Sequence, residues 1–406
     1  MPDKTTVASI SAIVALICVL SIASPLYAVS AEDLLKNPRY AGYIKLLEKY
    51  YPEGEKRQSL TKEINAILKE FDRIRQRVKV TKPFKYKIAT LAPEGTAWIS
   101  YTRDLQIPFI EEVSKGTTGI TLYTGGVMGE DKDVLRKMKM GQLHGCGCGA
   151  QGIIAAAPEL SVFNLPFLFR NYQEVDYILS KFRKDIEEIL FKKGLLLFTL
   201  IDSGNLYVFL KNNTPTLDDL KKQKFTTWFG NIDKVFLQNL GITPIPIPIT
   251  EVFGALTTGM ANAGISPAGW MLGMQAYKAS NYFLESPVAY SIAGVVLEKR
   301  SLEEEAEKSG ITKKDAIRMA ELSVRLNRIL KVDEIWNEML RDFERRCLDA
   351  FMQAGMKPTR FSDDDMHTME LAGRKTWDDL SGKDYSKELL DRVIAALDEY
   401  RKNHPM

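Results

Sequence analysis

The chain has 406 residues, of which 45% are hydrophobic and 26% are charged, and its formal net charge at pH 7 is +3. A chain of this length exceeds what one hydrophobic core usually supports, so two lobes with a sizeable shared interior are expected. The charge is nearly balanced and no block of lysine and arginine stands out, which argues against nucleic acid as a partner.

Residues 1–31 have the pattern of a secretory signal peptide. A lone Lys4 precedes an apolar run from Val7 to Leu20, and small residues follow it. Cleavage between about Ala28 and Glu32 fits this pattern and predicts a periplasmic protein. An uncleaved anchor helix is the alternative, and no other stretch is long and apolar enough to span a bilayer.

Residues 32–82 predict a helical extension. A tyrosine-rich helix ending at Pro52 is followed by a longer amphipathic helix with Ser59 as a possible cap. The apolar stripe of the longer helix consists of Leu60, Ile64, Ile67, Leu68, Phe71, Ile74 and Val78. This stripe either packs on the globular body or docks a partner subunit or a second copy of the chain.

Residues 83–204 are predicted to form a first lobe. Strands are expected over residues 86–91, 119–123 and 143–149, with a long helix from 97 to about 115. Two more strands, over 195–199 and 206–210, are predicted to flank the passage from this lobe to the next.

Three residues of this region are candidate ligand contacts. Trp98 begins the long helix beyond the carboxyl end of the first strand, where a ligand could meet backbone N–H groups, although Trp98 could equally belong to the core. Gln151 lies in a glycine-rich segment whose bare backbone suits close ligand approach, and a plain turn would need those glycines too. Asn205 lies at the predicted passage between the lobes.

The cysteines predict neither a metal centre nor a cofactor. Cys146 and Cys148 alternate on one face of the third strand, and with Cys347 they make an odd number, which cannot form a complete disulfide framework. A zinc site would need more cysteine or histidine than the chain readily offers. We therefore expect Cys146 and Cys148 to be small buried residues of a tightly packed strand.

Residues 205–290 are predicted to form a second lobe. Strands near residues 224–228 and 263–265 alternate with helices, and Thr250 is a possible cap for a helix starting at Glu251. Such an alternation makes a parallel sheet, which binds ligands at the carboxyl ends of its strands. Near those ends stand Thr226, Thr227, Trp228, Asn231 and Trp270.

This region resembles the second lobe of the solute-binding proteins of TRAP transporters, the DctP family. The family motifs LDDLKG, KIRVP and EVYTALQTGxxDG match residues 217–220, 224–227 and 251–259 in the same order, and the likeness extends from about Tyr86 to Tyr400. The resemblance implies an α/β fold with two lobes around a central cleft, as in periplasmic binding proteins. Residues 291–406 would then supply a return strand and C-terminal helices that pack across both lobes.

The resemblance also implies a function. Such a protein captures a small organic molecule outside the cytoplasm by lobe closure and delivers it to membrane-embedded transporter subunits. It needs no catalytic residue. Because His144, His367 and His404 lack a suitable nucleophile nearby in sequence, the chain is not expected to be an enzyme, although a periplasmic scaffold or enzyme is a further alternative.

The sequence departs from the family at the position that normally binds a carboxylate. Relatives carry an arginine as the third residue of KIRVP, because guanidinium pairs bidentately with a carboxylate, and this chain has Thr226 there. A buried carboxylate without such a partner is costly, so the expected ligand is neutral or apolar. The second possibility is an organic acid held by another cation, such as Arg103 or Arg170. Some variant receptors that work with a helical-repeat protein also lack the arginine, which implies such a protein as an additional partner.

Overall fold

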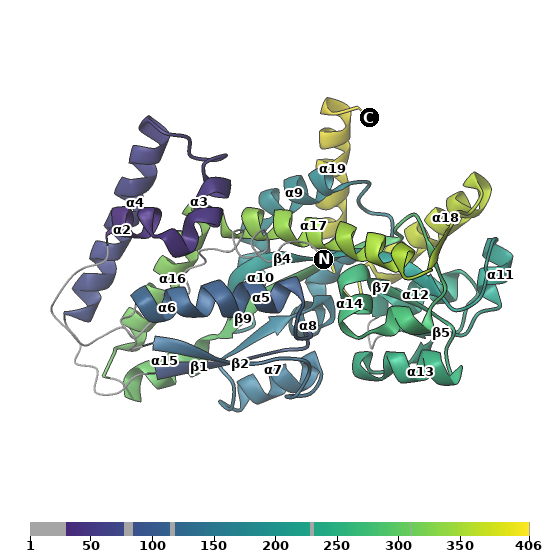
Figure 1. Ribbon diagram of the computed structural model, residues 1–406, viewed down its shortest axis with the longest axis horizontal. Helices are drawn as coiled ribbons and strands as arrows, with labels where there is room; N and C mark the ends of the chain where they lie inside the picture. The colour runs from purple at the N-terminus through teal and green to yellow at the C-terminus, as the bar shows by residue number, and fades with distance from the viewer. Residues whose placement is uncertain (1–29, 77–83, 114–117, 228–230, 309, 406) are drawn as a thin grey trace.

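A single mixed sheet of ten strands runs through the molecule (Figure 1). The computed structural model describes residues 30–76, 84–113, 118–227, 231–308 and 310–405. The strand order is β2-β1-β3-β9-β4-β7-β5-β6, with β8 beside β4 and β10 beside β8. The strands are β1 (Phe84–Thr90), β2 (Thr118–Tyr123), β3 (Gly145–Cys148), β4 (Leu195–Leu210), β5 (Phe225–Thr227), β6 (Ile245–Pro246), β7 (Ala263–Pro267), β8 (Tyr282–Leu284), β9 (Ala289–Glu298) and β10 (Lys357–Thr359).

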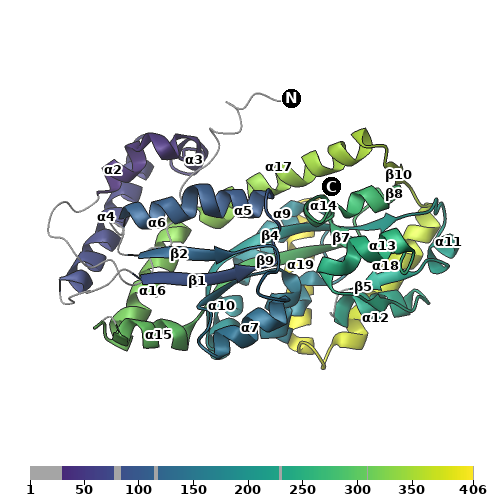
Figure 2. The ribbon, with the colours of Figure 1, turned by 60° about the horizontal axis from the view of Figure 1, so that its bottom comes forward.

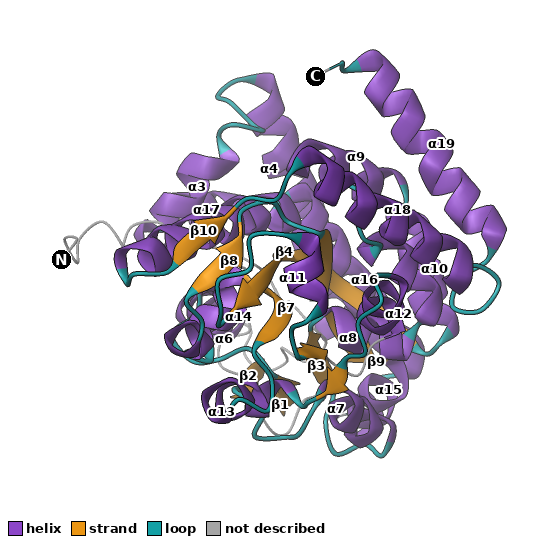
Figure 3. Ribbon diagram, turned by 90° about the vertical axis from the view of Figure 1, so that its right-hand side faces the viewer, coloured by secondary structure: helices purple, strands orange, loops and turns teal. Residues whose placement is uncertain are grey.

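Helices cover both faces of the sheet, as the end-on view in Figure 3 shows. One core cluster joins the sheet to the N-terminal helices and to α5, α6, α16 and α17, and a second joins its other face to α7–α10 and α19. The first helices are α2 (Ala31–Lys36), α3 (Ala41–Leu47), α4 (Glu55–Arg75), α5 (Ala97–Tyr101), α6 (Ile107–Val113), α7 (Asp131–Lys139), α8 (Ala150–Ala156), α9 (Tyr172–Lys181) and α10 (Arg183–Lys192). The others are α11 (Leu217–Lys221), α12 (Asn231–Asn239), α13 (Val252–Thr258), α14 (Ala268–Gly273), α15 (Lys299–Lys308), α16 (Lys313–Ile329), α17 (Val332–Gln353), α18 (Asp363–Leu380) and α19 (Lys387–Asn403). None of the described helices is both long and apolar enough to cross a bilayer.

The two lobes are joined by β4 and β9, and the long helix α17 runs beside this junction (Figure 2). The sequence predicted two strands flanking residues 202–205, and this was wrong, because β4 is one strand of 16 residues. Gly204 has a φ of +114°, and the pairing with β9 shifts register between Asp202 and Gly204. The predicted break is therefore a β-bulge, which bends the strand while its pairing with β9 continues.

The N-terminal helices pack on the body of the protein. The predicted apolar stripe of α4, except Val78 outside the described residues, is buried in the same core cluster as α16 and α17. Tyr40 contacts Phe109 of α6 with ring centroids 5.3 Å apart, and the Tyr43 hydroxyl donates to the Leu330 carbonyl. These contacts favour packing on the chain's own body over docking of a partner.

The N-termini of the helices show which residues act as caps. Thr312 and Ser362 cap α16 and α18, since their side chains accept hydrogen bonds from the backbone N–H of Asp315 and Asp365. Ser59 lies inside α4, which begins at Glu55, so it is not a cap. Thr250 does not cap α13 either, because it lies within a 3₁₀ turn (Ile249–Glu251) that leads into that helix.

Candidate functional site

A partly open cavity of about 70 Å³, here named the inner cavity, lies between the sheet and the helices α5 and α17. The carboxyl ends of β1 and β3, the middle of β4 and β9, and Trp270 of α14 complete its wall. Its hydroxyl and amide side chains are Thr90, Thr102, Gln106 and Ser203. Among the described residues that line it, none is Asp, Glu, Lys, Arg or His, so the wall offers no counter-charge to an ionic ligand.

A second cavity of about 20 Å³, here named the Thr226 cavity, lies in the second lobe. Its wall includes Thr226, Gly264, Ser266 and apolar side chains, and Trp270 belongs to the walls of both cavities. The Thr226 hydroxyl is buried and has no hydrogen-bond partner among the described residues. Native structures leave few buried polar groups unpaired, so this hydroxyl is available to bond a ligand or water.

Two tryptophans close the space between the lobes. The rings of Trp98 and Trp270 lie 5.8 Å apart, centroid to centroid, and both side chains are buried. The Trp98 indole N–H donates to the Asp202 carbonyl at 3.3 Å, which fixes the ring at the β4 bulge. The two residues therefore form one aromatic wall and do not lie in separate hydrophobic interiors.

Two glycines allow α14 to approach the start of α5. Gly269 and Gly273 are four residues apart and share one helix face. A Cβ at Gly269 would lie 2.6 Å from the Trp98 ring, and a Cβ at Gly273 would lie 2.7 Å from Pro93. Contact between the lobes at this surface therefore depends on the absence of both side chains.

The substitution Gly273→Ala should lower the free energy of unfolding by about 1–3 kcal/mol, because the added methyl group meets Pro93. Gly254→Ala in α13 is the matched control, since a Cβ there meets nothing within 4 Å. Replacing this helical glycine should stabilise the protein by about 0.5–1 kcal/mol. Urea unfolding measures both values. If Gly273→Ala raised the free energy of unfolding as much as the control does, this surface would not be closed in solution.

The remaining predicted ligand residues lie away from the two cavities or are already bonded. The Asn205 amide donates to Glu344 at 3.1 Å, and the exposed Asn231 amide donates to Asp384 at 3.2 Å. Gln151 in the first turn of α8 and the buried Thr227 do not line either cavity. Trp228 lies outside the described residues. Of the predicted ligand residues, Trp98 lines the inner cavity, Thr226 lines the Thr226 cavity, and Trp270 lines both.

Side chains of α17 hold the β4 bulge. Asn337 accepts from the Asp202 N–H at 2.8 Å, and Arg341 donates to the Asp202 carboxylate at 2.5 Å. The buried Glu344 carboxylate accepts from the Asn205 N–H at 2.8 Å and from the Tyr172 and Tyr207 hydroxyls at 3.0 and 3.1 Å. A Cβ at Gly204 would lie 2.3 Å from that carboxylate. The charged face of this helix therefore fixes the junction between the lobes, which its sequence alone did not indicate.

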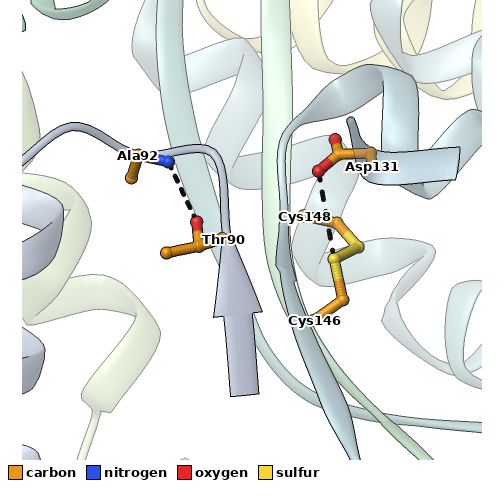
Figure 4. Close-up of a disulfide and its surroundings, with 5 residues drawn as sticks. All are labelled: Thr90, Ala92, Asp131, Cys146 and Cys148. Carbon is orange, nitrogen blue, oxygen red and sulfur yellow. Dashed lines mark hydrogen bonds between the residues drawn. A yellow bond between two sulfur atoms is a disulfide. The ribbon is translucent and has the colours of Figure 1, made fainter. Parts of the chain in front are cut away.

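Cys146 and Cys148 form a disulfide, which the sequence analysis did not predict (Figure 4). Both residues are buried, as expected, and the odd cysteine is Cys347, which is free and buried. Asp131 lies beside the disulfide, with its Oδ1 4.0 Å from the Cys146 sulfur. Three ligand-type atoms thus lie within 4.8 Å of one another, but the bonded sulfurs are not thiolates and cannot serve as metal ligands in this form.

The two arginines considered for an organic acid do not line either cavity. Arg103 is exposed and pairs with both carboxylate oxygens of Glu94, at 2.5 and 2.6 Å. Arg170 is exposed, and its backbone N–H donates to Glu174 at 2.9 Å. Neither guanidinium is therefore placed to bind an acid in either cavity.

Comparison with known proteins identifies the family. The family model of bacterial extracellular solute-binding proteins, family 7 (DctP), matches residues 88–384. The chain is 26% identical over 182 residues to the ectoine/5-hydroxyectoine-binding periplasmic protein UehA of Ruegeria pomeroyi, covering 43% of this chain and 53% of UehA. It is 25% identical over 178 residues to the ectoine-binding periplasmic protein TeaA of Halomonas elongata, covering 42% of this chain and 51% of TeaA. The chain thus spans about half the length of the curated relatives it matches.

Solved structures share the fold. The sugar acid binding protein DctPAm of Advenella mimigardefordensis, in complex with galactonate, superposes with a TM-score of 0.67 at 19% identity and covers 78% of this chain and 99% of its own. A TRAP periplasmic solute-binding protein of Xanthobacter autotrophicus with bound β-D-galacturonate gives the same TM-score at 17% identity, with 77% and 99% coverage. The predicted two-lobed α/β fold is therefore confirmed. Since the family model matches most of its length, the chain belongs to the DctP family of bacterial extracellular solute-binding proteins.

Proposed function

We propose that the protein is the extracytoplasmic receptor of a TRAP-type secondary transporter and captures a small, neutral or largely apolar organic ligand by lobe closure. The ligand would then pass to membrane-embedded transporter subunits, and a helical-repeat periplasmic protein would be an additional partner. The observation that carries the ligand class is the wall of the two cavities. Its described residues include no ionisable Asp, Glu, Lys, Arg or His side chain, and a threonine occupies the position of the usual arginine.

The chemistry of the wall favours this ligand over an acid. A carboxylate that moves from water into an apolar space loses its hydration. A cation or several hydrogen-bond donors must compensate for that loss. The relatives named above bind ectoine or sugar acids, so an acidic ligand is the competing candidate. It would need a cation, and neither Arg103 nor Arg170 lines the cavities. A neutral ligand instead uses the faces of Trp98 and Trp270 and the Thr226 hydroxyl.

Native mass spectrometry of the protein purified from the periplasm tests the proposal. We expect a neutral, largely apolar compound to co-purify unchanged, and its retention should fall at least tenfold in Trp270→Ala, because a buried aromatic contact is lost. Phe191→Ala is the control, since this partly exposed aromatic side chain does not line either cavity.

Calorimetry with galacturonate and galactonate tests the competing candidate, an acidic ligand. Micromolar binding of either acid, with no neutral compound retained, would overturn the proposed ligand class. Loss of that acid binding in Arg103→Ala or Arg170→Ala would establish the competing candidate. Chemical conversion of the retained compound by the purified protein would point to an enzyme instead.

A further inference from the structure

Two buried N–H donors on the wall of the inner cavity have no hydrogen-bond partner among the residues that the structure describes. They are the Gln106 side-chain amide and the Trp336 indole N–H, and their side chains are 5% and 2% exposed. Two other polar side chains of the wall already make hydrogen bonds: the Thr102 hydroxyl donates to the Trp98 carbonyl at 3.0 Å, and the Thr90 hydroxyl accepts from the Ala92 N–H at 3.1 Å. The wall therefore offers two N–H donors that are available to a bound molecule.

An irregular helical turn carries Gln106. Residues Thr102–Gln106 form a π-helical turn between α5 and α6, and the Ile107 N–H donates to the Thr102 carbonyl five residues back. Pro108, which has no N–H, follows directly. Such turns occur frequently at functional sites, because the extra residue alters which side chains a helix turns inward. Here the turn places an amide side chain on a mostly apolar wall.

The size and lining of the inner cavity indicate what could occupy it. At about 70 Å³ the cavity has roughly half the volume of an engineered apolar cavity that binds benzene, so it can hold a group of a few heavy atoms. A buried water needs two to four polar partners, and this wall is mostly apolar with two free donors. A small apolar group with one hydrogen-bond acceptor fits the wall better than water does.

We infer that the inner cavity is a subsite for an uncharged acceptor group, a carbonyl or ether oxygen on a small hydrocarbon end of the ligand, and that Gln106 donates the hydrogen bond to it. This inference rests on the proposed function, since it specifies one part of the neutral ligand. The hydrocarbon would pack against Trp98 and Trp270, and the Trp336 N–H is a second donor on the wall. Gln106 would then be a specificity-determining residue, which selects the ligand by an uncharged acceptor and not by a carboxylate.

Butan-2-one and its alkene isostere 2-methylbut-1-ene test the inference, because they differ in one acceptor atom. Ligand-observed NMR titration measures both dissociation constants. In Gln106→Leu, we expect butan-2-one to bind about tenfold more weakly, while the alkene binds at least as tightly as to the wild type. Gln58→Leu, an exposed position of α4, is the control and should change neither value.

Stability provides a second readout. Because the Gln106 Nε2 group is buried without a partner among the described residues, Gln106→Leu should leave the urea midpoint unchanged or raise it, whereas loss of a structural hydrogen bond would lower it. Equal changes for ketone and alkene, or binding of neither probe to the wild type, would overturn the inference. The two proposals can also fail separately. If an organic acid co-purifies and Gln106 still discriminates between the two probes, the proposed ligand class is overturned but the subsite is retained.

Discussion

Replacing Arg341 with methionine is expected to lower the free energy of unfolding by about 3–5 kcal/mol, because it leaves a buried charge without its partner. The Arg341 guanidinium bonds Asp202 at 2.5 Å and Asp176 at 2.6 and 2.8 Å. Asp202 is 1% exposed and accepts one further hydrogen bond, from the Tyr290 hydroxyl. Urea unfolding followed by circular dichroism measures the loss.

The pH dependence of this loss follows from the same contacts. Burial raises the pKa of the Asp202 carboxyl, and the nearby Arg341 opposes that rise. Without Arg341 the folded-state pKa rises further above its unfolded value. The folded variant then binds more protons than its unfolded chain, so its stability falls as pH rises. We therefore expect the deficit of Arg341→Met to be larger at pH 8 than at pH 5.

Two further variants separate the lost charge pair from a general effect on α17. Arg345→Met, one turn along the helix, removes a guanidinium that is 75% exposed and bonds Asp342, so it should cost less than about 0.5 kcal/mol. Adding Asp202→Asn to Arg341→Met removes the stranded charge and should restore part of the stability. Equal losses in Arg341→Met and Arg345→Met, with no recovery in the double variant, would contradict the assignment.

The expected loss concerns function as well as stability. Asp202 belongs to the bulge where β4 passes between the lobes, and its carbonyl accepts the Trp98 indole N–H. Asn337, Arg341 and Glu344 hold this bulge from one face of α17. Movement of this helix face would therefore displace Trp98 and the wall it shares with Trp270.

The sequence predicted the parts of the site that depend on strand ends. Trp98, Thr226 and Trp270 were proposed because ligands bind at the carboxyl ends of parallel strands, and the structure brings these three residues to the two cavities. The predicted apolar stripe of α4 is buried for a similar reason, since helical periodicity depends on local spacing alone. Local patterns were sufficient for these features.

Features that depend on contacts between distant segments were not predicted. The charged face of α17 has the composition of a solvated helix, and only its packing on β4 reveals Glu344 as a buried partner of Asn205. Gln106 stands among apolar helix residues, and this is the one local signal that could have drawn attention to it. An odd cysteine count excludes a complete disulfide framework but not a single pair, so it does not argue against the Cys146–Cys148 disulfide.

The second large effect is a dependence of stability on pH that originates at Asp131. Burial, with a smaller contribution from the charge of Glu130, raises the pKa of the Asp131 carboxyl to about 7. The folded state therefore binds a proton that the unfolded chain releases near pH 4. The resulting stabilisation is complete below the unfolded pKa and is lost as pH rises through about 7. A pKa raised by about three pH units corresponds to about 4 kcal/mol.

Asp131→Asn removes this titration while keeping an oxygen for the N–H groups of Gly149 and Gly152. We expect the wild type to lose about 4 kcal/mol relative to this variant between pH 4 and pH 8, measured by urea unfolding with the disulfide intact. Asp133→Asn removes a partly exposed carboxyl from the same helix and should stay within about 0.5 kcal/mol of the wild type. If the free energy of unfolding varies with pH in the same way for the wild type and Asp131→Asn, the carboxyl is not held in a buried, proton-binding site.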